Sequence, residues 1–338
     1  KILNNMLKIS RKIIREVRSL ATLVLIVFLL KVTIVEAYIV PTGSMEGTIM
    51  TGDFLIGSRF AYGMRTPDWI GIPYTDKGFD IPYIRFPKFK EPRQGDVIIF
   101  KYPRDRYYKY VKRCIAEPGD SVKIEARKVF VNGIEYPLSE NGKFVSPMMA
   151  EGFQQNRMFH SDLGINKDHF KMFRIPQKGD HYTIVDGMPF INGEKSDWRF
   201  LLPLILLDGN SATLENQIIK YHFTMTDPND LFRRKGTRDV YNDYFPTGSW
   251  INPWSSSIKD EDFQLLHIDG KSVKAMDSYT IKQDYYWAMG DNRDDSLDSR
   301  FWGFVPFNHI LGEALFVYFS LDLETWFPRL NRIATVLK

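Results

Sequence analysis

The chain has 338 residues, of which 44% are hydrophobic and 25% are charged, and its formal net charge is +4. This composition excludes a largely disordered chain and allows a buried core of ordinary size in one or two domains. The excess of positive charge lies in residues 1–18, so the rest of the chain is close to neutral and we expect no nucleic-acid partner. Cys114 is the only cysteine, which excludes an intrachain disulfide and a multi-cysteine metal site.

An apolar segment follows the basic N-terminus. Residues 20–30 read LATLVLIVFLL without interruption, and the apolar character continues beyond them with breaks that include Lys31 and Glu36. A helix needs about 20 residues to cross a bilayer, so we predict a basic cytoplasmic N-terminus over 1–18 and one transmembrane anchor over 19–38. The positive-inside rule then places the rest of the chain on the outer side of the membrane.

The same segment also fits a cleavable signal peptide. It combines a basic region, an eleven-residue apolar region and small residues at −3 and −1 of a cleavage after Ala37. Either interpretation exports the bulk of the chain, and we favour the retained anchor.

Turn signals beyond this segment predict a predominantly β protein. Gly-Asp stands directly before four runs rich in β-branched and aromatic residues, at Gly52-Asp53, Gly95-Asp96, Gly119-Asp120 and Gly179-Asp180. Asn-Gly lies between strand-forming residues in 129–136 and 189–196, which predicts two hairpins. We predict no helix of convincing length between residues 50 and 280.

A proline-rich and aromatic stretch covers residues 67–92, which contain five prolines. We interpret it as an irregular loop or edge hairpin. The alternative is an aromatic patch that rests on lipid headgroups.

Two short segments near the membrane side carry candidate chemistry. In PTGSM, residues 41–45, Ser44 lies in a turn that can expose its hydroxyl while flanking N–H groups face a carbonyl, although most such serines only form the turn. In YVKR, residues 110–113, alternation along a strand places Lys112 and Arg113 on opposite faces. One of these two basic side chains must therefore face the buried side.

The third candidate segment is GDNRDDSLDSRFWG, residues 290–303. Its density of short polar and charged side chains predicts a hydrogen-bonded loop in which Asp298 and Arg300 form an ion pair. A calcium-binding loop is the competing interpretation, but the spacing does not match the EF-hand pattern.

Together, in this order after a basic and apolar N-terminus, these segments resemble the successive sequence boxes of the type I signal peptidases. The resemblance rests on PTGSM with TGDFLI, QGDVIIFKYP, YVKRCIAEPGD and GDNRDDSLDSRFWG, and it covers about 38–62, 94–133 and 284–319. It implies a membrane-bound serine endopeptidase that removes signal peptides from exported preproteins after small residues at −1 and −3. The reaction would pass through an acyl-enzyme and need no cofactor or metal.

The resemblance also implies roles for single residues. Ser44 is the expected nucleophile, Lys112 its general base, and Thr42 the hydroxyl that joins the Ser44 N–H in the oxyanion hole. The expected supporting residues are Ser296, which orients the lysine amine, and the pair Asp298 and Arg300. The expected substrate pockets are lined by Val40, Ile49, Tyr110 and Val111 for the −1 side chain and by Tyr38 and Leu55 for the −3 side chain.

One position departs from the family pattern. Gly47 stands where a proline is usual after the nucleophile, and we expect this glycine to loosen the turn. Separately, a lysine acts as a base only when neutral, and at the reference pKa of about 10.4 well under 1% is neutral near pH 8. Burial should therefore lower the pKa of Lys112.

The resemblance further implies an organisation and a location. We expect a catalytic core over 39–122 and 280–320, an inserted β-rich domain without chemistry over 123–279, and a C-terminal tail over 321–338. We expect the bacterial cytoplasmic membrane, a single pass with the N-terminus inside, and membrane lipids as partners. The alternatives are a Ser/Lys maturation peptidase with a narrower substrate and a catalytically silent membrane-anchored β scaffold.

Overall fold

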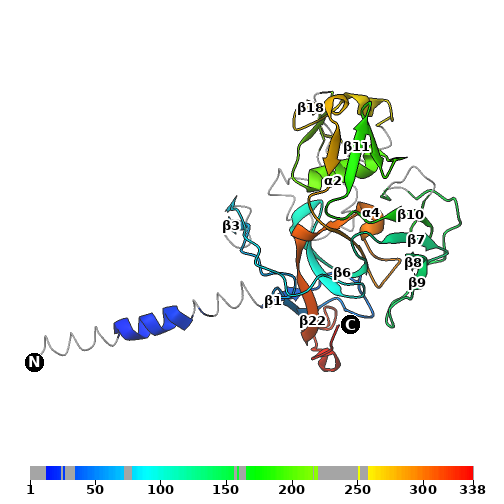
Figure 1. The fold of residues 1–338 in the computed structure, drawn as a ribbon. Coiled ribbons are helices and arrows are strands. Elements are labelled where there is room, and N and C mark those ends of the chain that lie inside the picture. Colours follow the sequence, from blue (N-terminus) through cyan, green and yellow to red (C-terminus); the bar gives the residue numbers. More distant parts are fainter. Residues whose placement is uncertain are drawn as a thin grey trace, which may run out of the picture.

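A seven-stranded antiparallel sheet forms the centre of the computed structural model (Figure 1). The structure describes residues 13–23, 26, 35–71, 78–155, 158–159, 165–215, 217–219, 250–251 and 258–337. In spatial order the strands of this sheet are β1 (Val35–Ile39), β2 (Asp53–Ser58), β22 (Ile310–Ser320), β5 (Val97–Tyr102), β6 (Asp105–Ala116), β20 (Tyr285–Met289) and β21 (Val305–Pro306). The C-terminal strand β22 therefore lies between the N-terminal strands β2 and β5, and both ends of the chain contribute to one sheet.

The central strands are apolar on both faces, because each face is covered. β5 has five buried residues out of six, and all five residues of β20 are buried. One face packs in a cluster that includes Tyr38, Val40, Leu55, Ile99 and Val317, and the other in a cluster that includes Tyr62, Ile98, Phe100, Tyr286 and Trp302. Such double burial is what the unbroken apolar run VIIF in β5 predicts.

The four Gly-Asp turns are confirmed as starts of strands, at β2, β5, β7 (Ser121–Glu125) and β11 (His181–Val185). Each glycine has a positive φ between 88° and 96°, which glycine adopts without strain. In each turn the aspartate side chain accepts a hydrogen bond from the backbone N–H three residues earlier. The aspartate thus closes the turn that the glycine permits.

The described residues form four smaller sheets besides the central one. Their strands are β10 (Phe170–Arg174), β7, β8 (Lys128–Val131) and β9 (Ile134–Tyr136); β13 (Glu194–Lys195), β12 (Met188–Ile191), β11 and β19 (Ser278–Thr280); β16 (Trp250–Ile251), β15 (Gln217–Ile219), β14 (Ala212–Leu214), β17 (Leu266–Ile268) and β18 (Lys271–Ser272); and β3 (Trp69–Gly71) with β4 (Gly78–Asp80). The short helical elements are α4 (Ser299–Trp302), η2 (Asp262–Leu265), η3 (Val273–Ala275), η4 (Phe307–His309) and η5 (Leu330–Arg332).

Both predicted Asn-Gly hairpins are confirmed. β8 and β9 pair around Asn132 and Gly133, and β12 and β13 pair around Asn192 and Gly193. All four turn residues have positive φ, as the type I′ turn requires. Within the stretch 67–92, β3 and β4 form a two-stranded hairpin, so the predicted edge hairpin is present, and Phe79, Phe86 and Phe89 of the stretch are exposed.

The prediction of no helix between residues 50 and 280 is wrong. α2 spans Trp198–Leu207, is capped by the side chain of Asp197 and contains Pro203. Nine of its ten residues are buried, so it has no polar face, and without a polar face the sequence shows no helical period. α2 lies in the upper part of the molecule in Figure 1, beneath β11.

The predicted membrane segment agrees with the structure only in part. Residues 13–23 are helical. Residues 35–38, the end of the predicted anchor, belong to strand β1 and pair with β2, so the anchor prediction is wrong there. Most of the remaining predicted anchor lies outside the described residues. Among the described residues no helix has the length and hydropathy of a membrane span.

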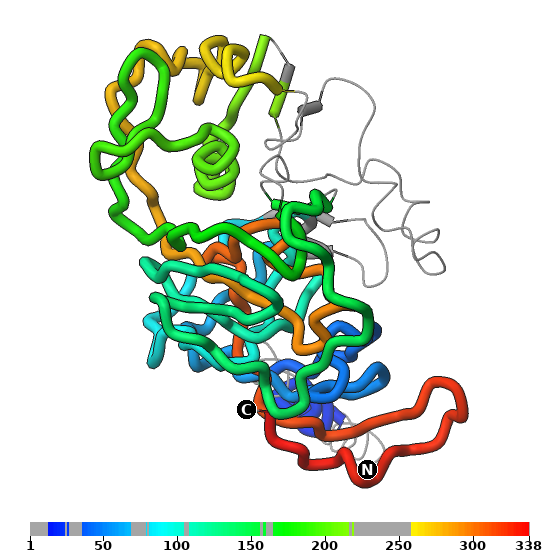
Figure 2. The backbone as a smooth tube through the Cα atoms, turned by 90° about the vertical axis from the view of Figure 1, so that its right-hand side faces the viewer, coloured from blue at the N-terminus to red at the C-terminus, as the bar shows by residue number. Residues whose placement is uncertain are grey.

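The C-terminal residues fold back onto the central sheet. Leu337 and Ala334 donate backbone hydrogen bonds to Leu315 and Val317 of β22. Figure 2 shows the segment after β22 as a projecting loop at the lower end of the molecule, where the chain also ends. The expected tail is thus an ordered part of the fold, next to β2 and β22.

Candidate active site

The turn that carries Ser44 begins directly after β1. Its backbone is closed by Glu46 N to Gly43 O and Ile49 N to Met45 O, and both Met45 and Ile49 are buried. The apolar side chains at these two positions hold the turn against the concave face of the sheet. Ser44 is left at the surface end of that turn, half-buried.

Gly47 tightens this turn, and the expectation that it loosens the turn is wrong. Its φ is +102°, a backbone conformation that proline cannot adopt. A Cβ at this position would lie 2.1 Å from the carbonyl oxygen of Asn141. The glycine therefore allows the chain at Asn141 to pack directly against the turn.

Lys112 in β6 reaches Ser44 from the neighbouring part of the sheet. Its Nζ donates a hydrogen bond of 2.5 Å to Ser44 Oγ and one of 3.1 Å to the carbonyl of Val111. The side chain is 3% exposed. Burial lowers the pKa of Lys112 to about 8, against the opposing charges of Asp298 and Asp291. About half of such lysines are neutral near pH 8.

Lys112 and Arg113 are both buried, with different partners. Arg113 forms two hydrogen bonds with the carboxylate of Asp291, at 2.9 and 2.7 Å, and that carboxylate also accepts from Thr48 at 2.6 Å. The ion pair ties β6 to the loop 290–300 and to the nucleophile turn. The roles of Arg113 and Asp291 were not predicted from the sequence. The signal for them is the second basic residue on the opposite face of the strand from Lys112, because a buried basic side chain needs an acidic partner.

The loop 290–300 brings three predicted residues beneath the site. Arg300 binds the carboxylate of Asp298 through Nε and Nη2 at 2.9 and 2.8 Å, so the predicted pair is present and fully buried. Burial raises the pKa of Asp298, but Arg300 and the Gly290 N–H hold that pKa below its ordinary value. Ser296 lies in the same loop, and its buried hydroxyl helps to hold the pKa of Asp298 below its ordinary value, while no hydrogen bond joins it to Lys112 among the described residues.

Thr42 lies beside the nucleophile. Its Oγ1 is 3.5 Å from Ser44 Oγ, and the residue is exposed. The turn itself is anchored to the loop 290–300, because Asn292 donates to the carbonyls of Ser44 and Gly43. The exposed Thr42 therefore belongs to a turn whose backbone is fixed by the loop 290–300.

The structure brings five of the six predicted pocket residues together. These residues are Tyr38, Val40, Ile49, Leu55 and Val111, which pack in one apolar cluster with Met45. Tyr110 is not among them, because its ring stacks on Tyr102 at 4.6 Å on the opposite face of β6. Its ring centre instead lies 5.4 Å from the Nζ of Lys112.

Strands β1 and β6 lie next to the site. Within the described chain β1 pairs only with β2, and β6 pairs with β20 from Arg113 onward. The ion pair between Lys109 and Glu36, at 2.7 Å, joins these two strands. Burial raises the pKa of Glu36, but Lys109 and Arg59 hold it below its ordinary value. From the sequence, Glu36 was predicted to lie in the membrane anchor, and no role was predicted for Lys109.

A serine bound to a buried lysine of lowered pKa, without histidine, defines the class of serine hydrolases that use a lysine base. The comparisons with known proteins identify the family. The family model described as signal peptidase, peptidase S26, matches residues 13–198 and 236–319. The chain therefore belongs to the signal peptidase family, peptidase S26, and is a serine endopeptidase that removes signal peptides from exported preproteins.

Curated relatives agree with this family. The signal peptidase I of Buchnera aphidicola subsp. Schizaphis graminum is 26% identical over 338 residues, covering 95% of this chain and 81% of that protein. The signal peptidase I of Aquifex aeolicus is 24% identical, covering 93% of this chain and 87% of that protein. A crystal structure of signal peptidase I from Enterococcus faecalis matches 66% of this chain and 97% of that chain at 16% identity. Its TM-score of 0.24 is too low to support a structural argument.

Proposed function

We propose that Ser44 is the nucleophile of this signal peptidase and Lys112 its general base. The observation that carries the proposal is the 2.5 Å hydrogen bond between Lys112 Nζ and Ser44 Oγ. It is supported by the burial that lowers the pKa of Lys112 to about 8. A base with a pKa near the working pH is both present in its neutral form and able to take a proton.

The proposed reaction has two stages. Ser44 Oγ attacks the carbonyl carbon of the −1 residue while its proton moves to Lys112 Nζ. The C–N bond then breaks, the departing amine takes that proton, and the signal peptide remains as an ester on Ser44. Water attacks the ester with Lys112 again as the base, and Ser44 is regenerated.

The negative charge on the carbonyl oxygen needs donors on the open side of the site. We propose that these are the Ser44 N–H and the Thr42 hydroxyl, which lies 3.5 Å from Ser44 Oγ. Ser296, Asp298 and Arg300 act through Lys112. The charges of the Asp298–Arg300 pair act on the Lys112 amine, and Ser296 acts through Asp298 in the same loop.

The cleavage region of the substrate would bind as an extended strand. Strand β1 offers backbone groups for such a strand, because it pairs only with β2 within the described residues. The cluster of Tyr38, Val40, Ile49, Leu55 and Val111 includes a residue of β1, Tyr38. A shallow apolar cluster of this kind suits small side chains at −1 and −3. The location of Tyr110 on the other face of β6 favours a role beside Lys112 instead of in the −1 pocket.

We propose a retained membrane anchor with the N-terminus in the cytoplasm and the catalytic part on the outer face of the bacterial cytoplasmic membrane. The basic residues before an apolar run support this topology. The C-terminal loop supports lipid contact, because it exposes large apolar side chains beside β2 and β22; these are Leu323, Trp326, Phe327 and Leu330. Aromatic side chains of this kind suit the membrane interface.

The proposed domains follow the sheet only in part. The central sheet uses strands within 35–116 and 285–320, which supports a core near 39–122 and 280–320. One apolar cluster nevertheless joins Ile124 and Leu204 of the insert to Trp287 of β20. The insert over 123–279 therefore shares its core with the catalytic sheet. The segment 321–338 is a C-terminal extension of that sheet.

Cleavage of a purified preprotein in detergent tests the proposed nucleophile. Ser44→Ala should leave no product above background, because the attacking oxygen is removed while the turn keeps its backbone. Ser58→Ala, a serine of β2 away from Lys112, is the control and should retain activity. Cleavage by Ser44→Ala at more than a thousandth of the wild-type rate would show that another group is the nucleophile.

A further inference from the structure

The loop 290–300 is held from below by a segment of the insert, residues 143–169. Lys143 exchanges backbone hydrogen bonds with Asp291 and Arg293, at 3.0 Å each. The N–H groups of Val145 and Ser146 donate to the carboxylate of Asp294 at 2.7 and 2.8 Å. The backbone of the insert therefore reaches the loop between Asp291 and Asp294, in the GDNRD stretch.

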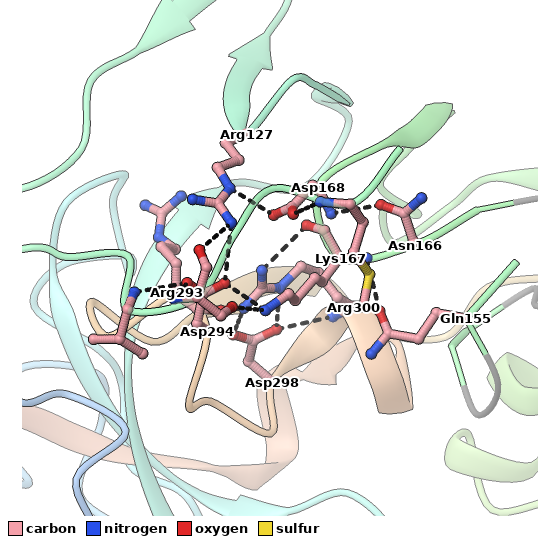
Figure 3. A network of polar contacts seen from close by, with 12 residues as sticks. Arg127, Gln155, Asn166, Lys167, Asp168, Arg293, Asp294, Asp298 and Arg300 are labelled. Atoms are coloured by element: carbon pink, nitrogen blue, oxygen red, sulfur yellow. Dashed lines mark hydrogen bonds and ion pairs between the residues drawn. The ribbon is translucent and has the colours of Figure 1, made fainter. Parts of the chain in front are cut away.

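Lys167 holds the same loop with two different groups. Its Nζ donates to Asp294 at 2.5 Å and to Ser146 Oγ at 2.9 Å. Its backbone carbonyl accepts a hydrogen bond of 3.2 Å from Arg300 Nη1. Figure 3 shows Lys167 next to Asp294 and Arg300, with Arg127 and Asp168 above it in the view. Lys167 is 8% exposed, so these contacts are shielded from water.

Arg300 links Lys167 to the proposed base. Besides Asp298 and Lys167, its guanidinium donates to the carbonyl of Arg293 at 2.6 Å. The charged groups with the largest effects on Lys112 come from this loop; they are Asp298, Asp291, Arg300 and Asp295. A displacement of the loop would therefore change both the position of these charges and the pKa of Lys112.

We propose that Lys167 is a positioning residue for catalysis: its ammonium and its carbonyl hold the loop 290–300 so that the Asp298–Arg300 pair stays beneath Lys112. The inference rests on the proposed role of Lys112 as the base. It assigns to the insert a part in the chemistry that its sequence does not show. Lys167 itself contacts neither substrate nor Ser44.

Lys167→Met tests the proposal, because methionine keeps most of the stem volume and removes the ammonium. Loosening the loop should lower kcat about tenfold or more, since a displacement of about 1 Å at a catalytic group can cost 10²-fold. KM should change less than twofold. The pH at which kcat reaches half of its maximum should increase by about half a pH unit or more. An Asp298 that is paired less firmly with Arg300 stabilises the charged form of Lys112.

Two matched variants accompany it. Lys167→Arg keeps a donor for Asp294 and should recover most of the wild-type kcat and pH profile. Lys128→Met, which removes an exposed lysine of β8 paired with Glu135, should behave as wild type. If Lys167→Met does not fold, Ser146→Ala removes only the second acceptor of the ammonium and should move kcat and the pH profile in the same direction by a smaller amount.

Hydrogen exchange separates this inference from the proposed function. Amides of residues 290–301 should exchange faster in Lys167→Met than in Lys128→Met, whichever residue is the base. Unchanged exchange, or a pH profile that stays in place while kcat falls with the folded fraction, overturns the positioning role. Activity in Lys112→Met would instead overturn the assignment of the base and leave the exchange result standing.

Discussion

Two buried lysines stand on either side of the loop 290–300, and their surroundings differ. Lys112, at 3% exposure, donates to a hydroxyl and a peptide carbonyl. Lys167, at 8% exposure, donates to the carboxylate of Asp294. Burial penalises the charged form in both places, but only Lys167 has an anion in contact that offsets the penalty.

The difference explains how one chain uses the same side chain for two purposes. Without a contacting carboxylate, Lys112 has a pKa of about 8 and can act as a base. With one, Lys167 and Asp294 form an ion pair that anchors a loop, and Lys167 together with backbone N–H groups lowers the pKa of Asp294 to about 2 in spite of burial. The nearest acid, more than the depth of burial, separates the proposed base from the proposed anchor.

The sharpest test of this comparison removes the base. Lys112→Met should lower kcat by about 10²–10⁴-fold, the range expected for loss of a general base. Lys112→Arg should be equally inactive, because a guanidinium stays charged and cannot accept the proton. Steady-state kinetics on a preprotein peptide measure both. Retention of more than about a tenth of the wild-type kcat by either variant contradicts the assignment.

The oxyanion donor should have the next largest effect. Thr42→Val keeps the shape of the side chain and removes its hydroxyl, so kcat should fall by about 10²–10³-fold while KM changes little. Thr42→Ser keeps the donor and should remain active. A Thr42→Val enzyme that turned over near the wild-type rate would leave the backbone N–H groups as the donors.

The buried base should also appear in the stability of the protein. Between pH 8 and 10.5 the unfolded chain binds more protons at Lys112 than the folded chain does, so the contribution of this group to stability rises with pH. The free energy of unfolding of wild type, relative to Lys112→Met, should increase by about 3 kcal/mol across that window. Urea unfolding at several pH values measures it. A difference that stays flat with pH means that Lys112 is not desolvated.

Gly47 tests the contact between the insert and the nucleophile turn. Gly47→Ala places a Cβ 2.1 Å from the Asn141 carbonyl and should destabilise the fold by about 1–3 kcal/mol, with a loss of kcat. Gly133→Ala is the matched control, because Gly133 also has a positive φ and nothing lies within 4 Å of its added Cβ. Equal losses of stability in the two variants would mean that the positive φ alone, and not the contact with Asn141, destabilises Gly47→Ala.

The smallest effect should come from a third lysine, Lys109, which joins β6 to Glu36 of β1 and is 42% exposed in its side chain. Lys109→Met should change kcat/KM less than about fivefold, because half-exposed ion pairs contribute little. The change should appear with peptides that extend beyond −3 and not with shorter ones, since Lys109 lies three residues along β6 from Lys112. Equal changes of kcat/KM for the longer and the shorter peptides would contradict binding of the substrate along β6.

Local signals in the sequence predicted much of the fold. The Gly-Asp turns and Asn-Gly hairpins are confirmed because each depends on a backbone angle or side-chain contact within four residues. The motifs around Ser44 and Lys112, and the pairing of Asp298 with Arg300, are likewise short-range patterns. α2 was missed because burial on all sides removes its helical period.

Residue identities alone therefore determined the turns, the strand-forming runs, the family and the candidates Ser44, Lys112, Asp298 and Arg300. Tertiary structure decided which charges meet. The pKa of Lys112, the packing of Gly47 against Asn141 and the contacts of Lys167 with the loop all join segments far apart in the chain. Desolvation and ion pairing depend on distances in space, and no local pattern encodes a distance between two residues more than a hundred positions apart.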